Sequence, residues 1–426
     1  MMFILTLLQF VNIIHTVQSK SFQNHFYLHE SGSYKTQKKF TYGRQKYQNK
    51  LYKNTTQIST ASFDITFSCT QPFGYDIGSK LDICAFASNS IISAAKTLEA
   101  SVHLPTPVRV ILSFRSFCSD SSGNPGTPCK SPSSTLGYAR PYGLHQFTND
   151  VARSYGLDPA FTYPSALVRQ YVPDDPDLNA QAFDITSSFN SDYNWYYQAD
   201  PRNRVWDSAQ IMKDGFYNQS STQSFDFEQV VLHEFIHGLG FVSSWGVWSD
   251  IENLFLPAFL DQTDDGTIVG IQPSYIINKA LSDSVNRVWI TAYADIIAKS
   301  FEQALRDGGQ EKWMELFEES VGGKVGKSLA APDGLFRTPN ALYIWFPGTD
   351  QTSKLQFAVL NTPSTFSPGS SITHLDSDVY RGISSYLMRP SATQGLPLRN
   401  YIPYQTNTIG RDILGILRSI GYITRY

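Results

Sequence analysis

The residues best suited to chemistry lie in one short run, H-E-F-I-H-G-L-G, at positions 233–240. His233 and His237 are four positions apart, so on a helix both imidazoles leave the same face and can reach one metal ion. Neutral imidazole is a preferred zinc ligand. Glu234 follows the first histidine, where a carboxylate can take a proton from a water molecule at the metal and pass it to a leaving amine. The pattern predicts a hydrolytic zinc site with Glu234 as general base.

Two histidines do not complete such a site, because catalytic zinc commonly has three protein ligands. Only His374 lies beyond the motif, and it stands in G-S-S-I-T-H-L-D, a Gly/Ser-rich loop able to fold back on the motif helix. We therefore predict His374 as the third ligand. Met388, in S-S-Y-L-M-R-P, is by itself typical of a core residue. The eight histidines are His15, His25, His29, His103, His145, His233, His237 and His374.

The run H-E-F-I-H-G-L-G-F, the later histidine and L-M-R-P together resemble the metzincin zinc proteases, which carry H-E-x-x-H-x-x-G and a methionine turn under the metal. Most metzincins have the third ligand three residues after that glycine, where this chain has Ser243. The chain is similar instead to leishmanolysin-type metzincins, in which an insertion precedes the third histidine. It looks closer still to secreted metzincin-like peptidases that share, in order, L-G-Y-A-R-P, Y-P-x-A-L, D-I-x-x-x-F-N-S, the motif helix, G-S-S-I-x-H-L-D, L-M-x-P and I-L-x-x-I-G-Y. The resemblance covers residues 63–423.

This resemblance implies an α+β fold: a metzincin-like catalytic domain with a twisted mixed sheet, an active-site helix and a large, mostly helical insertion between the second and third ligands. It implies a cleft floor of His233, His237, His374 and Met388. Substrates of such enzymes lie extended along an edge strand. The matching stretch here is 183–190, so Phe183, Ile185 and Ser187 are the expected contacts. Pro390 stands where some metzincins have a tyrosine near the metal, so no tyrosine receives that role.

The elements around the motif follow from patterning. Asp226 and Gln229 form a capping pair, so a helix should begin near Phe227, and Gly238 and Gly240 should end it. Upstream, F-D-I-T-F, P-V-R-V-I-L-S-F, T-L-G-Y-A-R-P-Y and A-F-D-I-T-S-S-F predict strands, and residues 82–102 predict a helix.

Downstream of the motif, residues 284–320 predict helices and A-L-Y-I-W-F and L-Q-F-A-V-L predict strands. The last predicted helix has one apolar face and should stop at Gly421. That face consists of Ile409, Ile413, Ile416, Leu417 and Ile420.

The chain of 426 residues divides into three predicted parts. Residues 1–19, an apolar run ending on small residues, predict a signal peptide and therefore secretion. Residues 20–62 are polar, basic and rich in tyrosine, which predicts a linker or pro-segment. Residues 63–426 form the catalytic domain, in which about 245–370 is the insertion and 371–426 a C-terminal subdomain with the third ligand, methionine turn and final helix.

The formal net charge of −3 is small for this length, so neither a nucleic-acid nor an anionic-membrane partner is expected. No later segment is apolar enough to cross a bilayer. Protein or peptide substrates are the expected partners, and we expect a monomer. Four cysteines in a secreted chain favour two disulfides; pairing Cys118 with Cys129 would leave Cys69 with Cys84, and buried thiols are the alternative. Asn54 and Asn218 begin glycosylation sequons.

A second ion site has weak support. The stretch 259–270 predicts a hairpin turning at Asp265-Gly266. Asp261, Thr263 and Asp265 loosely imitate a calcium loop, but loop position twelve is Gln272 rather than an acid.

Two other functions stay open. In a gluzincin-type metalloprotease the third ligand would be a glutamate on a downstream helix. Alternatively, the chain is a catalytically inactive secreted binding or adhesive protein on a protease scaffold, which the tyrosine-rich basic segment would suit. The glutamates available to the first alternative are Glu302, Glu311, Glu315, Glu318 and Glu319.

Overall fold

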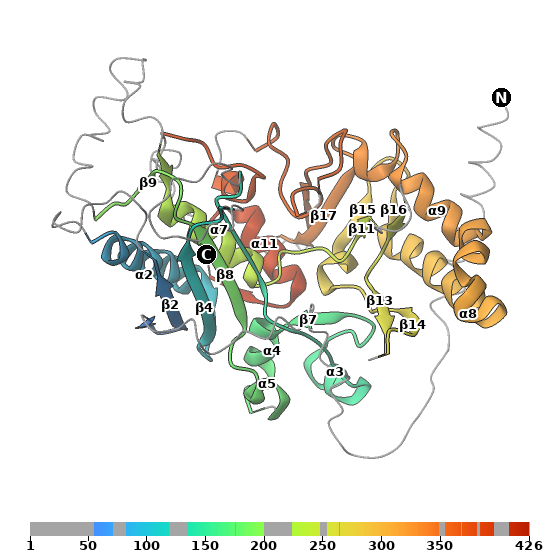
Figure 1. The fold of residues 1–426 in the computed structure, drawn as a ribbon, viewed down its shortest axis with the longest axis horizontal. Coiled ribbons are helices and arrows are strands. Elements are labelled where there is room, and N and C mark those ends of the chain that lie inside the picture. The colour runs from blue at the N-terminus through green and yellow to red at the C-terminus, as the bar shows by residue number, and fades with distance from the viewer. Residues whose placement is uncertain are drawn as a thin grey trace.

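In the computed structural model (Figure 1), a five-stranded sheet with its helices occupies one half of the molecule and a second, smaller sheet with a helix pair the other. The two helices α7 and α11 lie between these halves. The structure describes residues 55–70, 82–118, 134–174, 176–199, 224–247, 254–263, 265–348, 354–367, 369–380, 384–395 and 409–425.

The main sheet is mixed. Its order is β1 (Thr55–Ser59), β2 (Phe63–Cys69), β4 (Val108–Arg115), β8 (Ile185–Asn190) and β5 (Gly137–Pro141). The strands β2, β4 and β8 run parallel to one another, whereas β1 and β5 are antiparallel to their neighbours and form the two edges. β4 is buried on alternate positions, as its period-two apolar pattern predicts, whereas β8 is buried at five of its six positions.

Two helices cover this sheet. α2 (Ile83–Ser101) contacts α7 (Phe227–Gly238), and α7 also contacts β5 and β8. Stacking of the Phe63 and Phe235 rings, with centroids 5.6 Å apart, joins β2 to α7. A disulfide between Cys69 and Cys84 links the end of β2 to the start of α2. The helix that carries the chemistry is therefore held by the core on several sides.

Short elements connect these main ones. β19 (Ile423–Thr424) pairs with β3 (Val102–His103), which brings the end of the chain beside the main sheet. The others before the motif are β6 (Leu144–Gln146), α3 (Asn149–Tyr155), β7 (Thr162–Pro164), α4 (Ser165–Tyr171), α5 (Pro176–Ala180), β9 (Trp195–Tyr196) and β10 (Phe225–Asp226).

The segment after the motif builds the second half. Its four-stranded sheet has the order β16-β15-β17-β18, and the long helix α8 (Ile290–Glu319) packs against α9 (Val321–Ala330). α8 bends at Gly309, whose φ of 58° is left-handed. The remaining bounds are β11 (Gly246–Val247), β12 (Phe255–Leu256), β13 (Leu260–Gln262), β14 (Ile268–Ile271), η2 (Ile276–Ala280), β15 (Leu281–Asp283), β16 (Val288–Trp289), η3 (Leu335–Arg337), β17 (Leu342–Pro347) and β18 (Leu355–Val359).

The C-terminal part closes the molecule with η4 (Ser384–Met388) and α11 (Arg411–Ile420). α11 contacts β17, and a Cβ at Gly415 would lie 2.2 Å from a ring carbon of Phe346. Only glycine permits this approach. The buried apolar residues of all three parts form one continuous core, so the second half is an insertion in the fold rather than a separate domain.

Several expectations from the sequence are confirmed. The helix predicted over 82–102 spans 83–101, the hairpin turns at Gly266 with a φ of 85°, and the last helix stops at Gly421 with a φ of 123°. Two expectations are wrong. The polar segment predicted to end at residue 62 includes β1, because residues 55–59 pair with β2. The insertion was expected to be mostly helical, but it also contains the four-stranded sheet.

Some predictions fall outside the described residues. These are the signal peptide, most of the basic segment, Asn54, Asn218 and Cys129. Cys118 is disulfide-bonded. Within the described part of the chain, no helix is both long and apolar enough to cross a membrane.

Candidate metal centre

α7 presents the first two histidines. Asp226 caps the helix, its Oδ1 accepting a hydrogen bond from the backbone N–H of Gln229 at 3.2 Å, and the helix begins at Phe227 as predicted. Four residues separate His233 from His237, so both rings leave one face, with centroids 4.7 Å apart. Local sequence therefore accounts for this half of the site.

The glycines that end α7 have different roles from each other. Gly240 has a φ of 120°, so it turns the chain as predicted. Gly238 is still helical, but a Cβ there would lie 2.5 Å from Cγ2 of Ile185 on β8. α7 ends at Gly238, as predicted, and the lack of a side chain there also permits close packing of α7 on the sheet.

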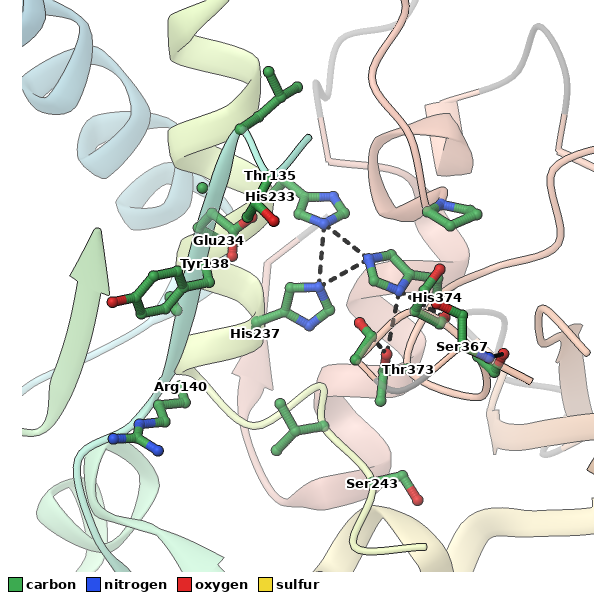
Figure 2. A pocket seen from close by; sticks show the side chains of 18 of the residues that line it. Thr135, Tyr138, Arg140, His233, Glu234, His237, Ser243, Ser367, Thr373 and His374 are labelled. Atoms are coloured by element: carbon green, nitrogen blue, oxygen red, sulfur yellow. Dashed lines mark hydrogen bonds between the residues drawn. The ribbon is translucent and has the colours of Figure 1, made fainter. Parts of the chain in front are cut away.

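The structure brings His374 to the other two histidines (Figure 2). The Nε2 atoms of His233 and His374 are 3.1 Å apart, those of His237 and His233 3.1 Å, and those of His237 and His374 3.2 Å. Among the residues that the structure describes, these three form the single group of histidine, cysteine or acidic side chains arranged to hold a metal.

The other ring nitrogen of each histidine faces a backbone carbonyl. His233 Nδ1 lies 2.6 Å from the oxygen of Leu387, His237 Nδ1 2.7 Å from that of Phe241, and His374 Nδ1 2.9 Å from that of Ser370. A carbonyl can only accept, so each Nδ1 carries the proton and donates it. Each neutral ring then has a bare lone pair at Nε2, and three lone pairs converge.

Burial supports this protonation state. It lowers the pKa of His233 to about 4 and, with the neighbouring His233, that of His237 to about 3. Burial and the other two histidines lower the pKa of His374 well below its usual value. The rings are therefore neutral near pH 7, and none can donate a hydrogen bond to another through Nε2.

This donor set fits zinc. An ion about 2.0–2.1 Å from each nitrogen in a tetrahedral shell holds them about 3.3–3.4 Å apart, close to the observed separations. Converging lone pairs repel one another unless a cation lies between them. Backbone carbonyls that orient each ring are the usual outer partners of metal-bound histidines.

Glu234 lies between α7 and β5, beside His233 and outside the three-histidine group (Figure 2). Burial raises the pKa of its carboxyl to about 8, an effect partly offset by a hydrogen bond from the backbone of Ala139 on β5. A carboxylate with a raised pKa beside a metal site is suited to exchange protons near neutral pH.

Met388 and Ser243 do not face the histidines as ligands. Met388 is fully buried, and its carbonyl accepts a hydrogen bond from the backbone N–H of Leu375 at 2.7 Å, one residue from His374. The turn at Met388 thus supports two histidines, since the Leu387 carbonyl binds His233. Ser243 donates instead to Asn278 Oδ1 at 2.9 Å, tying the loop after α7 to η2.

The three histidines and Glu234 line a cavity of about 1360 Å³. α7 and residues 134–144, which include the edge strand β5, form part of its wall, and residues 242–247, 366–367, 369–371, 373–374, 387 and 389–392 form most of the rest. The insertion and the C-terminal part therefore supply much of the wall around residues that local sequence positions on α7.

The strand predicted to bind substrate at the edge of the sheet is not the edge strand but its neighbour. Ile185 and Ser187 lie on β8, which pairs with β4 on one side and β5 on the other, and Phe183 precedes it. The edge is β5, which the sequence indicated as a strand but not as the edge. A signal was available, because Pro141 cannot donate to a ladder and proline is confined to edge strands.

The alternative metal ligands lie elsewhere. Glu302, Glu311, Glu315, Glu318 and Glu319 are on α8, and none of them lines the cavity. The calcium-like residues serve the hairpin, where Asp265 Oδ1 accepts hydrogen bonds from Thr263 and from the backbone N–H of Thr267. In the described ranges they form no group of converging ligands.

Comparison with known proteins identifies relatives without a stated activity. A family described as SPBPB7E8-like matches residues 24–306, which is more than half of the chain. The chain belongs to the SPBPB7E8-like family. A Schizosaccharomyces pombe protein described as "Uncharacterized protein PB7E8.01" is 24% identical over 382 residues, which cover 81% of this chain and 58% of that protein. No solved structure matches the chain.

The family match includes His233, Glu234 and His237 but ends before His374 and Met388. Two ligand candidates and the base candidate therefore lie inside the matched part, and the third ligand candidate lies outside it.

Proposed function

We propose that this chain is a secreted zinc-dependent endopeptidase of metzincin-like type that hydrolyses peptide bonds. The observation that carries the proposal is the triangle of three Nε2 atoms, 3.1–3.2 Å apart, with every ring proton committed to a backbone carbonyl. His233, His237 and His374 would hold the ion. When bound, zinc supplies a Lewis acid that polarises a carbonyl and lowers the pKa of water.

Glu234 performs the proton transfers in this proposal. Its carboxylate accepts a proton from the attacking water and returns it to the amine that leaves, so one group acts as base and then as acid. Burial favours this exchange because it brings the pKa of the carboxyl to about 8. The hydrogen bond from Ala139 keeps the carboxylate beside β5.

The edge strand β5 supplies a place for the substrate backbone. Within the described sheets β5 pairs with β8 alone, so its outer backbone groups, except the Ala139 N–H that bonds to Glu234, are available to an extended peptide. A peptide added as a further strand gains main-chain hydrogen bonds without regard to its side chains. In this proposal the peptide would lie across the cavity wall that β5 forms beside Glu234.

The decisive experiment compares wild type with Glu234→Gln. Casein hydrolysis by wild type, its loss on chelation, and a fall of at least about 10²-fold in Glu234→Gln with zinc content unchanged are the expected results. Hydrolysis that survives the substitution would exclude Glu234 as the base. Zinc at one ion per chain without any hydrolysis, also after removal of residues 20–54, which keeps β1, would favour the inactive binding or adhesive scaffold.

Secretion is part of the same proposal. The Cys69–Cys84 disulfide suits an oxidising compartment. Intact-mass measurement of protein recovered from the medium would locate the mature N-terminus; a mass that includes residues 1–19 would exclude signal-peptide removal.

A further inference from the structure

Arg389 lines the same cavity as the three histidines, and among the residues that the structure describes it has no ion-pair partner. Arg389 follows η4 directly and lines the cavity. It stands two residues after Leu387, whose carbonyl is 2.6 Å from His233 Nδ1. Two residues span at most about 7 Å, so the backbone of Arg389 lies close to the metal ligands.

Neighbouring residues hold the Arg389 guanidinium in place but do not neutralise its charge. Its Cζ lies 4.3 Å from the ring centroid of Tyr386, which is a cation–π contact. Tyr386 is buried, and its hydroxyl bonds to Thr393. Nε of Arg389 is buried without a hydrogen-bond partner, and within the described part of the chain the side chain has no ion pair. An ordered arginine without an acid is a ready binding site for a carboxylate.

The charges of the cavity favour the same ligand. Its described lining residues include two arginines, Arg140 and Arg389, and one acid, Glu234. Arg140 is exposed on β5 and points away from the three histidines in Figure 2. Arg389 is half-buried, which limits the screening of its charge by water.

We infer that Arg389 binds a carboxylate of the substrate, so that the enzyme prefers acidic peptides. The inference rests on the proposed peptidase function. The carboxylate has two sources: an Asp or Glu side chain near the scissile bond, or the C-terminus of a short peptide. Arg389 can hold either with two parallel N–H···O hydrogen bonds, for which lysine has no equivalent geometry.

Paired fluorogenic peptides test this. Each pair differs by Glu or Gln at one of the two positions on either side of the scissile bond, and each peptide is made with a free and an amidated C-terminus. For wild type we expect kcat/KM about 10- to 100-fold higher for the carboxylate-bearing member. A preference within the Glu/Gln pairs identifies the side chain as the source, and a preference for free over amidated peptides identifies the C-terminus.

The variants assign the preference to one residue. In Arg389→Gln the ratio should fall towards 1, and in Arg389→Lys it should be partly restored. Arg140→Gln removes the same charge from the cavity and should keep the ratio. Equal use of both peptides by wild type, or an equal loss of the ratio in Arg140→Gln, would overturn the inference.

A binding arm separates this inference from the peptidase proposal. Calorimetry with Glu234→Gln should show about 10-fold or tighter binding of the preferred peptide, lost when Arg389→Gln is added. If this binding is found but wild type does not hydrolyse the peptide, the peptidase proposal is refuted and the carboxylate site is retained. Turnover by wild type without any carboxylate preference would refute the site and leave the peptidase.

Discussion

Replacing Gly238 with alanine tests how closely the proposed metal centre depends on the packing of α7 against β8. A Cβ at this position would meet Cγ2 of Ile185 at 2.5 Å and Cδ1 at 2.8 Å. Ordinary carbon contacts are about 3.5–4.0 Å, so helix and strand must separate by about 1 Å. Overpacking of this kind costs about 1–3 kcal/mol of unfolding free energy.

The same displacement should reach the histidines. His237 precedes Gly238 directly, and its Nε2 must stay 3.1–3.2 Å from two others for one ion to bind all three. A misplacement of about 1 Å near a catalytic centre can lower activity about 10²-fold. We therefore expect Gly238→Ala to lower the urea midpoint, zinc affinity and peptidase activity together.

A double-mutant cycle isolates the contact. Ile185→Ala should destabilise by about 2–5 kcal/mol, because a fully buried side chain is lost. Combined with Gly238→Ala it should cost less than the sum, since the new methyl occupies the space vacated. Ile185→Val keeps Cγ2, the nearest atom, so it should relieve little. Strictly additive free energies in urea unfolding would refute the reasoning.

Position 270 supplies a matched control for the added methyl group. A Cβ at Gly270 on β14 would have no atom within 4 Å, so Gly270→Ala should leave stability and zinc affinity essentially unchanged. A loss comparable to that of Gly238→Ala would show that the effect is not one of packing.

Two further substitutions test the set of metal-ligand candidates and the buried ion pair beside the start of β8. His374→Ala should weaken zinc binding by about 10²–10³-fold, because one ligand contributes about a quarter of the zinc-binding free energy of about 10–16 kcal/mol in a four-ligand site. Full zinc retention in competition with a chelator would exclude His374 as a ligand. Arg169→Met should cost about 3–5 kcal/mol in urea unfolding, because Asp184, fully buried beside β8, loses a partner bonded at 2.6 and 2.9 Å.

Each of these has its own control. Glu302→Gln on α8 should keep zinc, because its carboxylate is 3.8 Å from exposed Arg306 and away from the cavity. Arg153→Met breaks an ion pair with Asp150 whose side chains are 64% and 93% exposed, so no measurable change in stability is expected. If Arg169→Met behaves like Arg153→Met, the buried pair is not important for folding.

Local sequence was sufficient for the motif helix. The four-residue spacing of His233 and His237, the cap at Asp226 and the turn at Gly240 each depend on neighbours within one or two helical turns. Such contacts follow from backbone geometry alone. The apolar alternation of β4 and the periodic face of α11 were readable for the same reason.

Position in the sheet could not be read in the same way. β8 and β5 both have strand-like sequences, yet only the order of strands makes β5 the edge and β8 an interior strand. Parallel strands are joined by long crossovers, so their order depends on packing of the whole domain rather than on any strand's own residues. The proline at position 141 was the one local clue.

The sequence by itself determined which side chains are available for chemistry: three histidines, one glutamate and their placement on or after a helix. The tertiary structure decided that His374, 137 positions from His237, comes within 3.2 Å of it. It also decided that His233 donates its ring proton to the carbonyl of Leu387 and that Gly238 packs against Ile185 on β8. These facts depend on contacts between distant segments, which form only when the whole core closes around them.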